Sequence, residues 1–138
     1  MRFSRGRAYD VMNRVILIVH HYEVLGALYA KILRLHGYAA QSVQSTEEAW
    51  SSLSQQKPQM LLIEDWAIDG WHHFNFMTAF ELVQWVRKQR ELADLPVVML
   101  GNLVASEAES KRVGCDAFLL LPSNPDELVA VVDAVARP

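Results

Sequence analysis

Cysteine is nearly absent from this sequence, because Cys115 is the only one in 138 residues. An internal disulfide framework is therefore excluded, and a single thiol suits a reducing compartment. Long apolar runs are also missing, since no segment approaches the ~20 apolar residues that a membrane-spanning helix needs. The apolar run after the arginine-containing start ends at His20, short of the roughly seven to fifteen residues of an export signal. We therefore expect a cytoplasmic protein.

The chain also has no large excess of charge of either sign. Thirteen lysines and arginines stand against 16 aspartates and glutamates, for a net charge of −3. This balance gives no electrostatic footprint for nucleic acid or for an anionic membrane. Only 5 prolines and 6 glycines occur, and they form no linker that would divide the chain. We expect a polar, flexible leader over residues 1–13 and one globular domain over residues 14–138.

Five short apolar runs alternate with longer amphipathic stretches. The runs are rich in valine, isoleucine and leucine and are almost continuously apolar, as in strands that are buried on both faces. The stretches between them carry apolar residues at three- and four-residue spacing, which is typical of helices that pack one face on a sheet. The expected strands are residues 15–19, 39–43, 60–65, 97–100 and 117–121.

Local signals mark the ends of several expected helices. Ser45 or Thr46 is a candidate N-cap, Asn124 precedes Pro125 at a first-turn position, and Gly37 suits a helix C-terminus. Alternating strands and helices predict an α/β fold, a single doubly wound, five-stranded parallel sheet with helices on both faces.

Ligands of open parallel sheets bind beyond the carboxyl ends of the central strands, where the strand order switches. The functional residues of this chain should therefore follow its expected strands. The residues at those ends are His20 and His21, Glu64 and Asp65, Gly101 and Asn102, and Leu121 and Pro122.

Several short motifs resemble the receiver domain of bacterial response regulators, the CheY-like family. They are "RVILIV", "LIEDWAI", "FELVQWVR", "LPVVMLGN" and "KRVGCDAFLLLPSNPDELVAVVDAV", and the resemblance runs from Asn13 to the C-terminus. It implies the strand order 2-1-3-4-5 and a role in two-component signal transduction, in which an aspartate accepts a phosphoryl group from a histidine kinase.

The departures from the family lie at its site residues. Where the resemblance implies two acids that bind Mg²⁺, this chain has His20 and His21, and imidazole is a poor ligand for that hard ion. Gly101 stands in place of a threonine or serine, and Leu121 in place of the lysine before proline. Phe118 fills the aromatic switch position without a hydroxyl.

The acceptor position is open between two neighbours. Counting from Pro58 reaches Glu64, whereas placing Ile68 three residues after the acceptor reaches Asp65, which we favour. With Glu64 there, a built-in carboxylate would resemble the charged, phosphorylated state.

These losses together predict a pseudo-receiver. Such a domain is not an enzyme, needs no cofactor and acts through a protein partner: a histidine kinase, an output domain or another signalling protein. The partner is expected to bind the face formed by residues 106–112, 117–121 and 126–136, or the aromatic loop 66–78. The sequence also allows a homodimer. The competing reading is a true phospho-receiver that uses Asp65, with Glu23, Glu64 or Asp69 as metal ligands. A flavin or nucleotide binder is disfavoured, because "HHYEVLG" has no phosphate-cradling loop.

The histidines also suggest a transition-metal site. Two imidazoles and carboxylates suit Zn²⁺, although adjacent strand residues point to opposite faces and rarely ligate together. A protonated His21 paired with Asp65 is the preferred alternative, and it would respond to pH near neutrality. The candidate metal ligands are His20, His21, Glu64 and Asp65, with Asp69, His72 and His73 in the loop.

Overall fold

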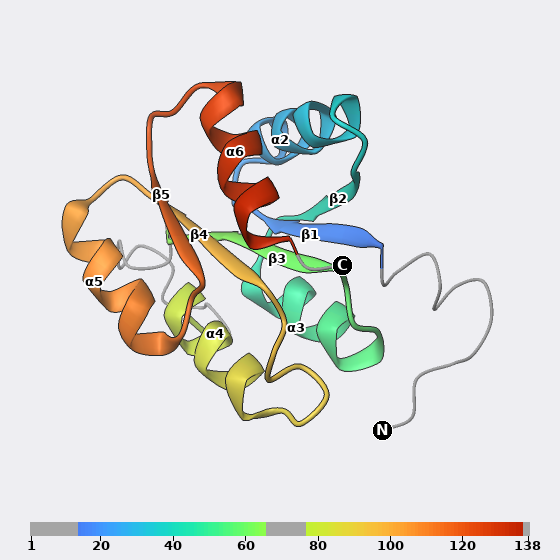
Figure 1. Cartoon of the computed structure of the whole chain (residues 1–138). Coiled ribbons are helices and arrows are strands. Elements are labelled where there is room, and N and C mark those ends of the chain that lie inside the picture. Colours follow the sequence, from blue (N-terminus) through green and yellow to red (C-terminus); the bar gives the residue numbers. More distant parts are fainter. Residues whose placement is uncertain (1–13, 66–76, 137–138) are drawn as a thin grey trace.

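The structure is a computed structural model that describes residues 14–65 and 77–136. Five parallel strands form one sheet in the order β2-β1-β3-β4-β5, as the sequence predicts (Figure 1). The strands are β1 (Val15–Val19), β2 (Ala39–Val43), β3 (Met60–Glu64), β4 (Val97–Gly101) and β5 (Ala117–Leu120). The helices are α2 (Glu23–Leu35), α3 (Thr46–Gln55), α4 (Ala79–Lys88), α5 (Val104–Val113) and α6 (Pro125–Val135).

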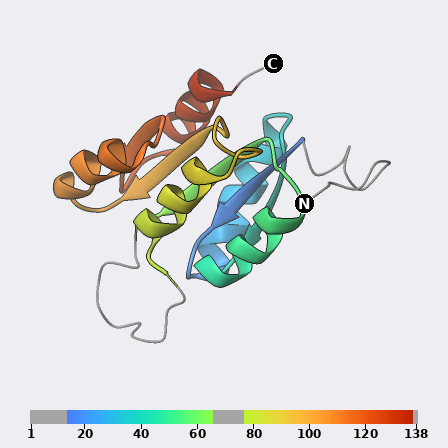
Figure 2. The same ribbon diagram turned by 90° about the horizontal axis from the view of Figure 1, so that it is seen from below.

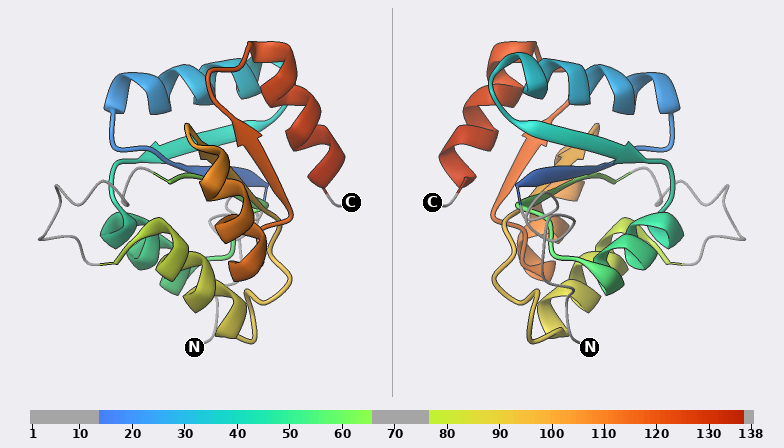
Figure 3. Two further views of the ribbon diagram at one scale, coloured as in Figure 1. Left: turned by 90° about the vertical axis from the view of Figure 1, so that its left-hand side faces the viewer. Right: turned by 90° about the vertical axis from the view of Figure 1, so that its right-hand side faces the viewer.

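The three central strands are buried over their whole length, which explains their unbroken apolar sequences. Each residue of β1, β3 and β4 is buried, whereas the edge strands β2 and β5 are partly exposed. Helices cover both faces because each parallel connection crosses over the sheet. Figure 3 shows α2 and α6 on one side and α3, α4 and α5 on the other.

Alternation along each strand divides the core into two clusters. Leu17 and Val19 of β1 face the layer of α3, α4 and α5, which Figure 2 shows side by side. Ile16 and Ile18 face α2 and α6. This alternation matters for the site, because it assigns consecutive residues at a strand end to opposite layers.

The helix ends confirm the predicted caps. The Ser45 hydroxyl accepts a hydrogen bond from the Glu48 amide, and Asn124 forms a reciprocal capping box with Glu127. Gly37 follows the C-cap of α2 with φ of +92°, a left-handed conformation that glycine adopts without strain. Each cap therefore sets where a helix starts or stops, and with it the lengths of the loops at the sheet edge.

Some expectations are adjusted by one residue and others are not tested. The strands β3 and β5 end one residue before the predicted ends, and β4 ends one residue after. The rings of Trp50 and Trp85 lie half-buried at the margin of the core, with centroids 6.1 Å apart. The leader 1–13 and the loop residues 66–76 lie outside the described residues. In the described part of the chain, no helix is long and apolar enough to cross a membrane.

Candidate functional site

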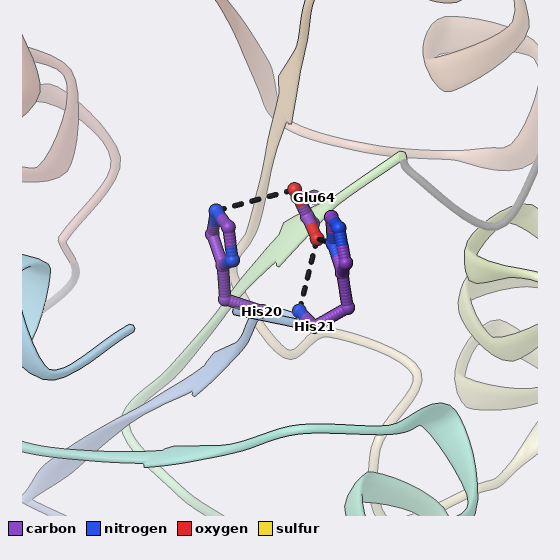
Figure 4. A group of neighbouring side chains, drawn as sticks. All are labelled: His20, His21 and Glu64. Atoms are coloured by element: carbon purple, nitrogen blue, oxygen red, sulfur yellow. Dashed lines mark hydrogen bonds and ion pairs between the residues drawn. The ribbon is translucent and has the colours of Figure 1, made fainter. Parts of the chain in front are cut away.

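The predicted site residues gather at the carboxyl edge of the sheet, but in two separate groups. His20, His21 and Glu64 form one cluster beyond β1 and β3 (Figure 4). Asp65 is not part of this cluster and lies beside Gly101, at the end of β4. The separation follows from the strand pleat, because Glu64 and Asp65 are consecutive and turn toward opposite helix layers.

Glu64 is held by both histidines. Its Oε1 atom accepts a hydrogen bond from the His21 backbone amide at 3.0 Å and also contacts Nδ1 of the His21 ring. Its Oε2 atom lies 3.2 Å from Nε2 of His20. The two imidazole rings are stacked, with centroids 5.5 Å apart and planes 8° from parallel. Both carboxylate oxygens of Glu64 are therefore already occupied by this chain's own side chains.

Two expectations about the histidines are wrong. Adjacent strand residues should point to opposite faces, yet both rings turn to one carboxylate, because β1 ends at Val19 and the chain bends at His21. The pair expected between His21 and Asp65 is replaced by a pair between His21 and Glu64. The pleat explains this second difference, since Asp65 faces the layer of α5.

The hydrogen bonds of His20 define its tautomer and argue against a metal site. The Tyr22 backbone N–H donates to Nδ1 of His20 at 3.1 Å, so Nδ1 carries no proton and Nε2 donates to Glu64. Zn²⁺ on Nε2 would require the proton on Nδ1, directly against the Tyr22 N–H. Nor does Mg²⁺ fit, because it prefers oxygen ligands and this cluster offers two imidazoles and one carboxylate.

Burial shifts the ionisation of the cluster. Burial, together with the neighbouring His21, lowers the pKa of His20 to about 4. Burial also raises the pKa of Glu64, while the hydrogen bonds from His21 oppose that shift. His20 is therefore neutral at pH 7, in agreement with its accepting Nδ1 atom.

We expect His20 to make the folded protein acid-sensitive. The unfolded pKa of 6.5 falls to about 4 on folding, so the unfolded chain binds more protons between these values and stability decreases as pH falls through that window. From pH 7 to pH 5 the loss attributable to His20 is about 2 kcal/mol. Urea unfolding of wild type and His20→Asn at both pH values tests this, because the variant should lack that part of the slope. Equal slopes would contradict the assignment.

Asp65 is buried, and it packs so closely against Gly101 that no side chain fits at position 101 without a shift of its neighbours. It is 4% exposed, and a Cβ atom built on Gly101 would lie 2.5 Å from its Oδ2 and 2.8 Å from two ring carbons of Phe118. Only glycine at position 101 therefore permits the Phe118 ring and the Asp65 carboxylate to approach in this way. The site position expected to carry a hydroxyl is filled by its neighbours instead.

One oxygen of the Asp65 carboxylate has no ordinary hydrogen-bond partner among the described residues. Among the described residues, Oδ2 of Asp65 and Oγ of Ser106 are buried without a hydrogen bond of ordinary geometry. Burial raises the pKa of Asp65, although the nearby Ser106 hydroxyl favours the charged form. Sequence reasoning did not connect Ser106 with the site. The available signal was a serine on the buried side of α5, where Ser106 and Ser110 take positions that apolar residues usually fill.

Leu121 supplies no charge to this edge. Its side chain packs with the core cluster of α2 and α6, its amide donates to the Gly101 carbonyl at 2.7 Å, and the peptide bond to Pro122 is cis. Within residues 14–65 and 77–136, no lysine or arginine forms an ion pair with Glu64 or Asp65. Among the described residues, the basic groups that contact the Glu64 carboxylate are the two imidazoles.

The comparisons with known proteins point to one class. No protein-family model matches the chain. It is 28% identical over 131 residues to the phosphate regulon transcriptional regulatory protein PhoB of Pseudomonas aeruginosa, covering 92% of this chain and 53% of that protein. The chemotaxis response regulator CheY4 of Vibrio cholerae has a similar structure, with a TM-score of 0.76, 23% identity, and coverage of 88% of this chain and 97% of that one.

A further solved structure agrees. The signal receiver domain of a signal transduction histidine kinase from Syntrophus aciditrophicus has a TM-score of 0.76 and 24% identity, with 88% of each chain covered. These likenesses, with the parallel order 2-1-3-4-5, show that the chain has the fold of response-regulator receiver domains and is similar to response regulators in sequence. The chain spans about half the length of the curated relatives that it matches first.

Proposed function

We propose that this receiver-type domain signals without the usual Mg²⁺-dependent phosphorylation and acts by binding a protein partner. The observation that carries the proposal is the use of Glu64: its two oxygens are held by His20 and His21 at the edge where a metal ion would have to enter. A histidine–carboxylate cluster thus replaces metal–carboxylate attraction.

Phosphorylation of a carboxylate concentrates negative charge that must be balanced. In phosphoryl transfer a metal ion and a fixed cation provide that balance. The described part of this site offers two stacked imidazoles, of which His20 is neutral at pH 7 because burial lowers its pKa to about 4. Leu121 adds no charge, and among the described residues no lysine or arginine pairs with Asp65 to balance a phosphoryl group there.

The position of Asp65 adds a steric obstacle. Its Oδ2 atom lies against Gly101 and the Phe118 ring, and the side chain is almost fully buried. An incoming phosphoryl group would have to displace that ring. These contacts support Asp65 as a vestigial acceptor, and His20 and His21, which both contact Glu64, as the residues that replace the acidic pocket.

The partner surface that we propose is the face formed by α5, β5 and α6. Leu103 and Val104, at the start of α5, and Leu120, at the end of β5, are exposed apolar side chains on this face. Exposed apolar side chains grouped in this way favour a protein partner such as a kinase, an output domain or another signalling protein. The alternative loop at 66–78 lies largely outside the described residues.

Incubation with acetyl phosphate and Mg²⁺, followed by mass spectrometry of the intact protein, tests this function. We expect the mass to stay unchanged, and beryllofluoride with Mg²⁺ to leave the thermal unfolding midpoint unchanged. A response regulator of known activity serves as the positive control in the same buffers. Stoichiometric addition of one phosphoryl group that is lost in Asp65→Asn would overturn the proposal and support a phospho-receiver with an unusual pocket.

A further inference from the structure

Helix α2 carries an apolar stripe that no described element covers. Val24, Leu28 and Leu35 are 79%, 46% and 74% exposed, although the helix already buries Gly26, Ala30 and Leu33 against the sheet. Figure 3 shows α2 in the layer that it forms with α6 on one side of the sheet. By the helical repeat, the stripe lies on the side of α2 opposite Gly26, Ala30 and Leu33. Most exposed large apolar side chains of the described residues lie on α2 or directly before it, and exposed apolar patches mark interaction sites.

The residues of the stripe follow the helical repeat, and the two ends of the helix beside it differ in charge. Val24 and Leu35 are about three helical turns apart and lie on one line, with Leu28 and Lys31 between them. Glu23 and Arg34 have the same separation and lie on an adjacent line, one at each end of the helix. The first turn is therefore acidic and the last turn basic along the same edge.

We propose that this stripe is the interface of a homodimer in which two copies of α2 pack antiparallel. A two-fold axis near the middle of the helix would place Val24 against the partner's Leu35, and Leu28 against the partner's Lys31. Such an interface is isologous, because the same patch is used by both copies. The aliphatic stem of lysine covers apolar surface while its ammonium group reaches solvent.

Charge complementarity selects a second copy in this orientation. Antiparallel packing brings the Glu23 end of one helix to the Arg34 end of the other, so opposite charges and opposite helix dipole ends meet. The Arg34 guanidinium also donates to the Ala40 carbonyl of its own chain, and it keeps its positive charge beside that contact. Parallel packing would instead place the two positive N-terminal ends of the helices side by side. The α2 stripe is separate from the face of α5, β5 and α6, so dimerisation would leave that face free for a different protein.

Sedimentation equilibrium of the full chain and of register-specific variants tests the dimer. The wild-type protein should be dimeric. Leu28→Lys places lysine against the partner's Lys31 twice in each dimer and should raise the dissociation constant about 100-fold, since like-charge juxtaposition costs several kcal/mol. Leu28→Glu faces the same Lys31 with opposite charge and should have a much smaller effect. The double variant Leu28→Lys with Lys31→Glu should restore dimerisation.

Val104→Lys is the matched control, because Val104 is 71% exposed on α5, away from the stripe, and its substitution should leave the dimer intact. Circular dichroism establishes that each variant folds. A monomeric wild-type protein at all accessible concentrations overturns the proposal, as does dissociation by Val104→Lys equal to that by Leu28→Lys. Equal disruption by Leu28→Glu and Leu28→Lys would overturn the antiparallel register.

Discussion

Replacing Glu64 with alanine should lower the free energy of unfolding by about 3 kcal/mol, whereas Asp65→Asn should raise it. Glu64 accepts from His20 and from the backbone and ring of His21, so its removal leaves buried donors unpaired and opens a cavity. Asp65 has the opposite environment, because its Oδ2 atom is buried with no hydrogen-bond partner among the described residues.

The sign for Asp65 follows from its raised pKa. A carboxyl group whose pKa is higher in the folded state destabilises that state when it is charged, at pH values above the folded pKa. Asparagine removes that charge and donates toward Ser106, so we expect a gain of about 1 kcal/mol at pH 7.5. The gain should disappear below the unfolded pKa of 3.8, where aspartate is neutral in both states.

Urea unfolding at pH 7.5 and pH 3.5 measures both effects in one series. Adjacent carboxylates then give changes of opposite sign, which a general sensitivity of this edge to mutation does not produce. If Asp65→Asn lowers the free energy of unfolding at pH 7.5, Asp65 has a partner or a role in the folded state. That result would support the alternative in which Asp65 is a phosphoryl acceptor.

Arg87→Ala should lower the free energy of unfolding by about 4 kcal/mol, the largest change expected for a residue away from the site. The Arg87 guanidinium donates to the carbonyls of Gly114, Leu95 and Ala93 at 2.9, 2.7 and 3.2 Å. It also forms an ion pair with Asp116 at 3.1 Å. The Asp116 carboxylate in turn accepts a hydrogen bond from the Val97 amide at the start of β4. One side chain thus joins α4, the chain before β4 and the turn before β5.

Arg112→Ala is the matched control for Arg87. Arg112 is also an arginine in an ion pair, with Glu109 three residues earlier on α5, but both side chains are largely exposed. Exposed pairs contribute little, so the change should be close to the error of the measurement. Chemical denaturation of both variants at pH 7 checks the contrast. Similar losses in the two variants would mean that the hydrogen bonds of Arg87 to backbone carbonyls contribute no more than a surface pair.

The fold was predictable because it depends on patterns that survive in local sequence. The continuous apolar runs of residues 15–19 and 97–100 require burial on both faces, and only helices on both sides of a parallel sheet provide it. Caps such as Ser45 and Asn124 act within a few residues, so their signals are also local. Strand ends shifted by one residue because hydrogen bonding to the neighbouring strand, and not apolarity, decides them.

The site was predictable in its location and less so in its pairings. Parallel strands bring their carboxyl ends together, so the gathering of His20, Glu64 and Gly101 at one edge follows from topology. The choice of Glu64 over Asp65 as partner of His21 depends on where β1 stops and the chain bends. The contact between Asp65 and Ser106 joins distant segments, and no local pattern encodes it.

The close approach at Gly101 limits which residues position 101 can hold. A Cβ atom there would collide with the Phe118 ring and with Asp65, so a threonine requires both neighbours to shift. A single substitution of Gly101 by threonine therefore gives a less stable protein. A hydroxyl group can be added at this position without that loss only if Phe118 or Asp65 changes with it.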